Sequence, residues 1–116
     1  MYSFTTDQRR YLAAAPGLAR IATVGPDGTP HVVPSGWSYD EELDALVLGG
    51  RNLERTKKFR DVTATGRAAL VIDDVLPPWR PRGIEIRGRA EAVAGSSPVI
   101  RVYPDRVVSW GLEEAT

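Results

Sequence analysis

Small or apolar residues alternate with charged residues from Arg82 to Val93, and this alternation constrains the fold more than any other feature of the chain. One set is Ile84, Ile86, Gly88, Ala90 and Ala92, and the other is Glu85, Arg87, Arg89 and Glu91. A period of two places the two sets on opposite faces of a β-strand. The pattern therefore predicts an antiparallel sheet with one face in the core and the other toward water.

Other segments show strand signals between turn residues. Leu18–Gly25 leads into a Pro-Asp-Gly turn, and Thr29–Tyr39 follows as its antiparallel partner. Pro30 and Pro34 within that partner indicate a sheet edge or a bulge, because proline cannot donate a ladder hydrogen bond. Further strands are predicted at Ala45–Gly50, at Arg67–Asp73 with both faces buried, and in a last hairpin of Val99–Val102 and Val107–Trp110 turning at Pro104-Asp105. The segment Leu76–Pro81 holds too much proline to be regular.

Helix signals occur at two places. Thr5 and Gln8 form a capping box before a helix that ends at Pro16-Gly17. Asn52 can cap a second helix, from Leu53 to about residue 63, whose inner stripe is Leu53, Thr56, Phe59 and Val62. Together these elements predict a mainly β fold in one domain, residues 1–116: a six- to seven-stranded antiparallel split β-barrel with two short helices.

Composition excludes several classes of protein. Fifteen basic residues balance fifteen acidic ones, so no global field attracts nucleic acid or an anionic membrane. The chain has no cysteine and a single histidine, His31, which leaves no thiolate nucleophile and no histidine-rich zinc site. No apolar run approaches the roughly 20 residues of a membrane span, and Met1–Arg10 is polar, without the apolar stretch expected of a signal peptide. We expect a cytoplasmic protein with no metal site.

The segment from Gly49 to Lys58 holds the residues most suited to binding a ligand. Two glycines end a strand, and a helix then begins with unpaired N–H groups and the positive end of its dipole. Arg51, Arg55 and Lys58 have the i, i+4, i+7 spacing of one helical face, and Thr56 and Lys57 add a hydroxyl and a cation. The segment thus predicts a phosphate-binding site, with a solvated basic face as the alternative.

A phosphate site of this kind needs an apolar body on its ligand. Two or three charge-assisted hydrogen bonds contribute about 3–8 kcal/mol before ordering costs, whereas micromolar affinity needs about 8 kcal/mol net. An aromatic ring system would supply the remainder by burial. The predicted walls for such a ring are His31, Val32, Val33 and Pro34 on one strand and Pro78 and Trp79 in the proline-rich segment.

These motifs, in their order and spacing, resemble the pyridoxamine 5′-phosphate oxidase-like family of split β-barrels, and in particular its coenzyme F420-dependent branch. The resemblance covers nearly the whole chain. It rests on Ile21–Pro34 (IATVGPDGTPHVVP), on Arg51–Val62 (RNLERTKKFRDV), and on Pro77-Pro78-Trp79 ahead of RGRAE at residues 87–91. The family implies a homodimer with a flavin or deazaflavin in each groove between protomers.

The resemblance also implies roles for residues. Arg51, Arg55, Thr56, Lys57 and Lys58 would hold the phosphate, residues 31–34 would lie along the ring, and Pro78 and Trp79 would reach the cofactor. The family implies no dedicated proton-transfer residue, so we expect none. Because true pyridoxamine-phosphate oxidases extend beyond the residue that ends this chain, Thr116, we do not expect oxidation of vitamin B6.

The leading hypothesis is a reductase that transfers hydride from coenzyme F420 to an unsaturated or conjugated small molecule. An FMN-binding oxidoreductase or flavin carrier is the first alternative. A single-stranded nucleic-acid-binding barrel, using Trp79, Arg80, Arg82, Arg87 and Arg89, is an alternative of another class, opposed by the zero net charge. A family member that dimerises without a cofactor is a further alternative.

Overall fold

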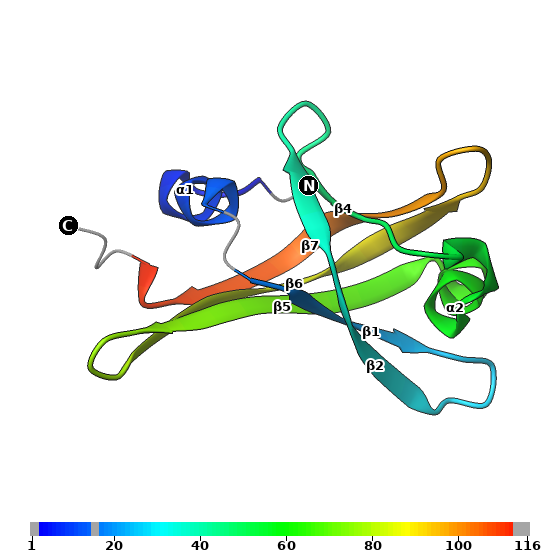
Figure 1. Cartoon of the computed structure of the whole chain (residues 1–116), viewed down its shortest axis with the longest axis horizontal. Coiled ribbons are helices and arrows are strands. Elements are labelled where there is room, and N and C mark those ends of the chain that lie inside the picture. Colours follow the sequence, from blue (N-terminus) through cyan, green and yellow to red (C-terminus); the bar gives the residue numbers. More distant parts are fainter. Residues whose placement is uncertain (1–2, 15–16, 113–116) are drawn as a thin grey trace.

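The structure is a computed structural model that describes residues 3–14 and 17–112. Within them the chain forms one seven-stranded antiparallel sheet, in the order β2-β1-β5-β6-β7-β4-β3, which curls into a half-barrel (Figure 1). The predicted mainly β fold is therefore confirmed. The strands are β1 Ala19–Val24, β2 Pro30–Ser35, β3 Trp37–Asp40, β4 Ala45–Leu48, β5 Arg67–Leu76, β6 Arg80–Val93 and β7 Val99–Trp110.

β2 and β3 follow one another in the chain but lie at opposite edges of the sheet. β2 pairs with β1, β3 pairs with β4, and Gly36 alone separates the two strands. The prediction of one strand over Thr29–Tyr39 is therefore wrong. The edge position inferred from Pro30 and Pro34 is confirmed, since β2 ends the sheet.

β5 and β6 form a long hairpin whose turn consists of Pro77, Pro78 and Trp79. Leu76 pairs with Arg80 across this turn, so both strands are regular up to it. The prediction that the proline-rich segment is irregular holds for the turn residues 77–79 but is wrong for Leu76, Arg80 and Pro81, which pair within the two strands. On β5, alternate residues from Ala68 to Ile72 are buried while Ala69 and Val71 are partly exposed, so the expected burial of both faces is only half realised.

β7 runs without interruption through Pro104, and the predicted hairpin turn there is wrong. The register against β6 shifts between Arg87, which faces Arg106, and Gly88, which faces Pro104. This shift leaves Asp105 as the additional residue of a β-bulge. A Cβ atom at Gly88 would lie 1.8 Å from a backbone oxygen of β7, so the bulge requires glycine at this position.

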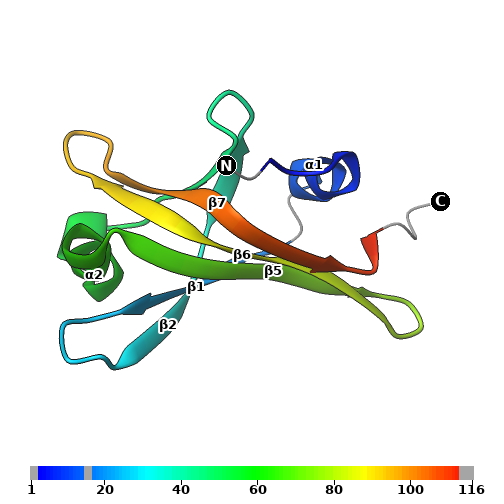
Figure 2. The ribbon, with the colours of Figure 1, turned by 180° about the vertical axis from the view of Figure 1, so that it is seen from behind.

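The inward residues of the strands form the core between two helices. α1, Thr6–Ala13, begins at the predicted Thr5–Gln8 capping box, and Figure 2 shows it at one end of the sheet with α2 at the other. The alternation along β6 is confirmed, because its apolar set is largely buried and its charged set lies outside. The most fully buried large side chains include Leu12, Ile21, Leu46, Leu48, Leu70, Ile72, Ile84, Ile86 and Ile100.

The second helical segment begins later than predicted. A 3-10 turn covers Leu53–Arg55, and α2 runs over Lys57–Thr65 with Thr56 as its N-cap. Asn52 is in the left-handed region, with φ 52°, and its side chain caps nothing, so its predicted role is wrong. The predicted inner stripe is correct for its three apolar members, because Leu53, Phe59 and Val62 are all buried. No helix in residues 3–14 or 17–112 is long and apolar enough to cross a bilayer.

Candidate functional site

The N-terminus of α2 presents hydrogen-bond donors suited to an anion. The Thr56 hydroxyl accepts from the Phe59 amide at 3.3 Å, and the Thr56 carbonyl accepts from the Arg60 amide at 3.2 Å. The amides of Lys57 and Lys58 make no hydrogen bond within the described part of the chain. Their N–H groups thus lie open at the positive end of the helix dipole, which is a favourable place for a phosphate.

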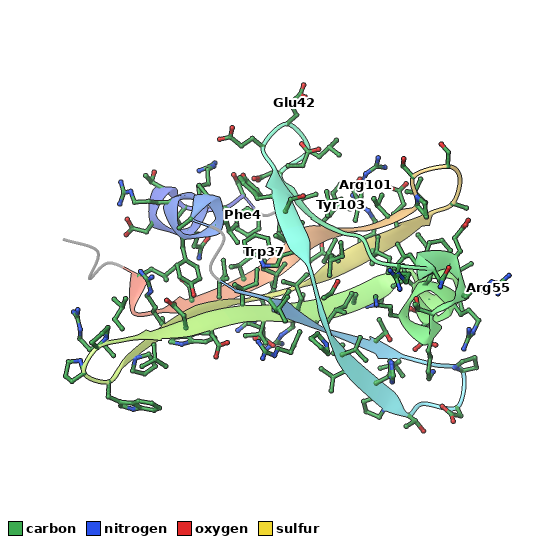
Figure 3. The ribbon with its side chains drawn as sticks, viewed as in Figure 1. Phe4, Trp37, Glu42, Arg55, Arg101 and Tyr103 are labelled. Atoms are coloured by element: carbon green, nitrogen blue, oxygen red, sulfur yellow. The ribbon has the colours of Figure 1, made fainter. Side chains whose placement is uncertain are left out.

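Three predicted phosphate ligands lie around this helix end, but in a different arrangement from the one expected. The spacing argument placed Arg51, Arg55 and Lys58 on one helical face; it is wrong, because α2 begins only at Lys57. Arg51 and Arg55 are exposed and Lys58 is half-buried. Their side chains make no hydrogen bond or ion pair with residues 3–14 or 17–112, and Figure 3 shows Arg55 extending from this end of the molecule into solvent.

Lys57 has an internal partner that the sequence analysis missed. Its Nζ atom donates to both carboxylate oxygens of Asp61, at 3.0 and 3.1 Å. The Asp61 side chain is only 3% exposed and also accepts from the Thr23 hydroxyl at 2.8 Å. The Lys57 side chain is 38% exposed, so this ion pair is only partly buried. A lysine four residues before an aspartate on a helix is a signal that could have indicated this pair.

The environment of Asp61 favours its charged form. Burial opposes ionisation, but hydrogen bonds from Lys57 and Thr23 and the attraction of Lys57 and His31 keep the pKa of Asp61 below its ordinary value. Lys57 also packs closely against the β1–β2 turn, since a Cβ atom built on Gly25 would lie 2.7 Å from its Nζ. Asp61 therefore holds one ammonium group in place at the first turn of α2.

The predicted wall on β2 is divided between the two faces of the sheet. Val33 packs against the core and His31 is half-buried on the same side, while Val32 is 62% exposed on the outer face with Pro34. A strand alternates its side chains, so the four side chains do not form a single wall on one face of β2. That residues 31–34 lie along a cofactor ring stays a prediction.

Pro78 and Trp79 lie far from the cation-bearing helix end within one chain. They form the turn of the β5–β6 hairpin, and β5 runs from that turn back to Arg67, beside the end of α2 (Figure 1). Ten residues of strand span about 30 Å. Trp79 is 73% exposed at the tip of the hairpin. One chain therefore does not bring the predicted phosphate ligands and this predicted wall together.

A cavity of about 390 Å³ opens on the outer face where β1, β5 and β6 meet. Its lining is largely apolar, with arginine side chains at the rim, and Thr23 belongs both to this lining and to the Asp61 hydrogen-bond network. The cavity thus lies next to the α2 site. The lining includes Ala22, Val24, Pro30, Ala68, Ala69, Arg67 and Arg87.

Arg82, one residue of the nucleic-acid alternative, is held by contacts within the chain. Arg82 donates to Asp74 at 2.8 and 3.0 Å, and its guanidinium lies 5.1 Å from the centre of the Tyr11 ring. Tyr11 donates to the same carboxylate, and burial and this carboxylate raise the pKa of Tyr11. This cluster attaches α1 to the sheet.

Among the described residues, no group of histidine, cysteine, aspartate and glutamate is placed to hold a metal ion.

Comparison with known proteins adds relatives to this geometry. Residues 5–110 match the family model described as pyridoxamine 5′-phosphate oxidase. The chain is 38% identical to the 5a,11a-dehydrotetracycline/5a,11a-dehydrooxytetracycline reductase of Streptomyces rimosus, over 95% of this chain and 84% of that protein.

Solved structures share the fold at lower identity. A FAD-binding protein of Mesorhizobium loti superposes with a TM-score of 0.71 at 16% identity, covering 93% of each chain. An F420 reductase superposes with a TM-score of 0.65 at 21% identity, covering 85% of this chain and 94% of that one. The sequence match and the shared half-barrel together show that this chain belongs to the pyridoxamine 5′-phosphate oxidase family.

Proposed function

We propose that this protein is a reductase that uses coenzyme F420 and delivers hydride to an unsaturated or conjugated small molecule. The observation that carries the proposal is the 38% identity, over 95% of the chain, to a reductase of dehydrotetracyclines. The family relationship and the fold shared with an F420 reductase support the class of oxidoreductase.

The donors at the α2 N-terminus fit the phosphate of such a cofactor. The backbone amides of Lys57 and Lys58, which make no hydrogen bond in the described part of the chain, supply neutral donors. The guanidinium groups of Arg51 and Arg55 have no partner among the described residues and can turn toward a bound anion. The Lys57 ammonium, held by Asp61, adds a positive charge whose position is already set. When bound, the cofactor would supply the hydride, and the residues of the chain would bind and orient it.

A homodimer is part of this proposal. Beside the cavity, Leu18 just before β1, Val32 on β2 and Val75 on β5 are each more than two fifths exposed. Apolar residues gathered on one sheet face are typical of a protein interface. A second copy covering this face would also supply Trp79 to a site whose phosphate ligands lie far from Trp79 within one chain.

Mixing two variants tests the shared site. In a two-fold dimer, an Arg55→Glu chain paired with a Trp79→Ala chain has one site with both native residues and one with neither. After equal mixing and re-equilibration, we expect F420 binding at about a quarter of all sites, since half of the dimers are mixed. If each site takes both residues from one chain, mixing will restore no binding.

Fluorescence titration of the purified protein with F420 and with FMN tests the choice of cofactor. We expect tighter binding of F420, and reduction of conjugated substrates only when reduced F420 is supplied. The FMN-dependent alternative has the support of the FAD-binding structural relative. Tighter binding of FMN than of F420 would replace the proposal with that alternative.

A further inference from the structure

The cavity between β1, β5 and β6 carries more positive charge than the surrounding residues neutralise. Arg67 on β5 lies directly opposite Arg89 on β6, and like charges in this relation destabilise a sheet. Arg89 stacks 4.4 Å from the centre of the Tyr103 ring, and Arg87 pairs with Glu85 at 3.1 Å. Arg87 and Arg89 therefore have partners within the chain, and of these three arginines Arg67 and Arg87 line the cavity.

Arg67 is the arginine whose side chain has no such contact. It is exposed at the rim of the cavity, and its guanidinium makes no hydrogen bond or ion pair with residues 3–14 or 17–112. Its backbone is held by the Thr65 hydroxyl at 3.2 Å, so the start of β5 is well defined while the side chain is available. A guanidinium at the mouth of an apolar cavity is suited to a carboxylate, which it can bind through two parallel hydrogen bonds.

The shape and lining of the cavity indicate the rest of the ligand. Its volume of about 390 Å³ lies within the range of sites that hold small molecules. Ala22, Val24 and Ala69 present a floor of small apolar side chains, which favours a flat hydrocarbon body over a polar one. A sugar or a peptide would leave its polar groups unpaired against this floor.

We propose that this cavity binds a planar, largely apolar molecule bearing one anionic oxygen group, and that Arg67 anchors that group. The assignment of this cavity as the substrate pocket of the reductase rests on the proposed function. Its position supports that role, because Thr23 lines the cavity and donates to Asp61, which holds Lys57 at the first turn of α2. A substrate here would lie beside the proposed cofactor site.

Two dyes that differ in one charge test the anchor. We would titrate the protein with 8-anilinonaphthalene-1-sulfonate, which is anionic, and with N-phenyl-1-naphthylamine, which has a similar apolar body without the charge. We expect Arg67→Gln to weaken the anionic dye about fivefold or more and to leave the neutral dye unchanged. Arg10→Gln, which removes an exposed charge on α1, is the matched control and should change neither dye. Equal binding of the anionic dye by wild type and Arg67→Gln would overturn the proposal.

A second variant tests the cavity itself. Ala69→Trp fills the floor, and it should abolish binding of both dyes while the far-ultraviolet circular dichroism spectrum stays native; Ala22→Phe replaces it if that variant does not fold. Retention of both dyes would place them elsewhere on the molecule and overturn the proposal. Two results together would assign the cavity to a second copy of the chain instead. Ala69→Trp would change the molecular mass measured by sedimentation, and Arg67→Gln would leave dye binding unchanged.

Coenzyme F420 separates this inference from the proposed function. We expect the anionic dye to bind in the presence of saturating F420, and Arg67→Gln to keep wild-type affinity for F420. Displacement of the dye by F420 would assign the anion site to the cofactor and overturn the assignment to substrate. Failure of F420 to bind at all would refute the proposed cofactor while the Arg67-dependent dye binding still stood.

Discussion

Reversing the charge at Arg55 and at Lys57 should have different consequences, although the two residues are near neighbours in the chain. The Arg55 side chain is exposed and makes no contact that stabilises the fold, so we expect Arg55→Glu to change the free energy of unfolding by less than about 0.5 kcal/mol. Lys57 is bonded to both oxygens of buried Asp61. Lys57→Glu would place a second carboxylate beside Asp61, and it should therefore lower the melting temperature clearly.

The effect of Arg55→Glu on cofactor affinity follows from the hydrogen bond that it removes. One charge-assisted hydrogen bond contributes about 1.5–3 kcal/mol, which corresponds to about a tenfold to 150-fold change in the dissociation constant. The new carboxylate also repels the phosphate, so we expect a loss near the upper end of that range. Fluorescence titration with F420 measures the affinity, and thermal unfolding of the same samples measures the stability.

Arg10→Glu is the matched control, because it makes the same change of charge at an exposed position on α1. It should leave the affinity unchanged and lower the melting temperature only slightly, because the exposed Arg10–Asp7 ion pair that it breaks contributes at most about 1 kcal/mol. The reasoning would be refuted if Arg55→Glu bound F420 as tightly as wild type. It would also be refuted if Arg55→Glu melted as early as Lys57→Glu, since Arg55 would then be structural.

Three further predictions concern the elements that position the site. Gly88→Ala should lower the free energy of unfolding in urea by about 3 kcal/mol or more, because its Cβ would overlap a backbone oxygen, whereas Gly36→Ala has open space and should change little. Thr56→Ala should cost about 1 kcal/mol of stability by removing the α2 cap, and Thr56→Ser should retain it. The pKa of Asp61 is lowered from 3.8, so its ionic contacts stabilise the fold above that value and are lost as the pH falls through the folded-state pKa. Asp61→Asn should therefore differ most from wild type at neutral pH, and the difference in melting temperature should narrow below about pH 4.

The parts of the fold that the sequence predicted correctly depend on neighbouring residues. Alternation along residues 82–93 is sufficient to assign the two faces of β6, because side chains on a strand alternate wherever the strand lies. The Thr5–Gln8 capping box is likewise complete within four residues and is confirmed. Pro30 and Pro34 indicated an edge strand, since proline affects the ladder at its own position.

The errors arise where a distant contact decides between local alternatives. Pro104 suggested a turn, but the chain continues as a strand because Gly88 on β6 leaves room for the bulge. Asn52 and Thr56 are both common capping residues, and the burial of Leu53 in the core under a 3-10 turn selects Thr56. Neither the continuation of β7 through Pro104 nor the choice of Thr56 as the cap can be predicted from the local sequence alone.

The candidate site was predictable in its chemistry more than in its geometry. The cations and Thr56 near the start of α2 were identified from residue types and glycine positions alone, although the capping role of Thr56 was not. The partnership of Lys57 with Asp61 also requires Thr23 from β1, which approaches the helix only in the folded sheet. The placement of these residues as cofactor ligands stays a prediction.

Charge balance across a whole chain says little about the field at one site. Fifteen basic and fifteen acidic residues cancel in sum, but an exposed charge acts over only about 8–10 Å at physiological ionic strength. Glu42 lies on the β3–β4 turn and Arg55 at the end of α2, in separate parts of the molecule (Figure 3). A phosphate at the first turn of α2 would therefore experience the local cations and the open helix amides, with the acidic turn largely screened. The zero net charge weighs against a long polyanion, which needs an extended positive surface, but it does not weigh against a small anionic ligand.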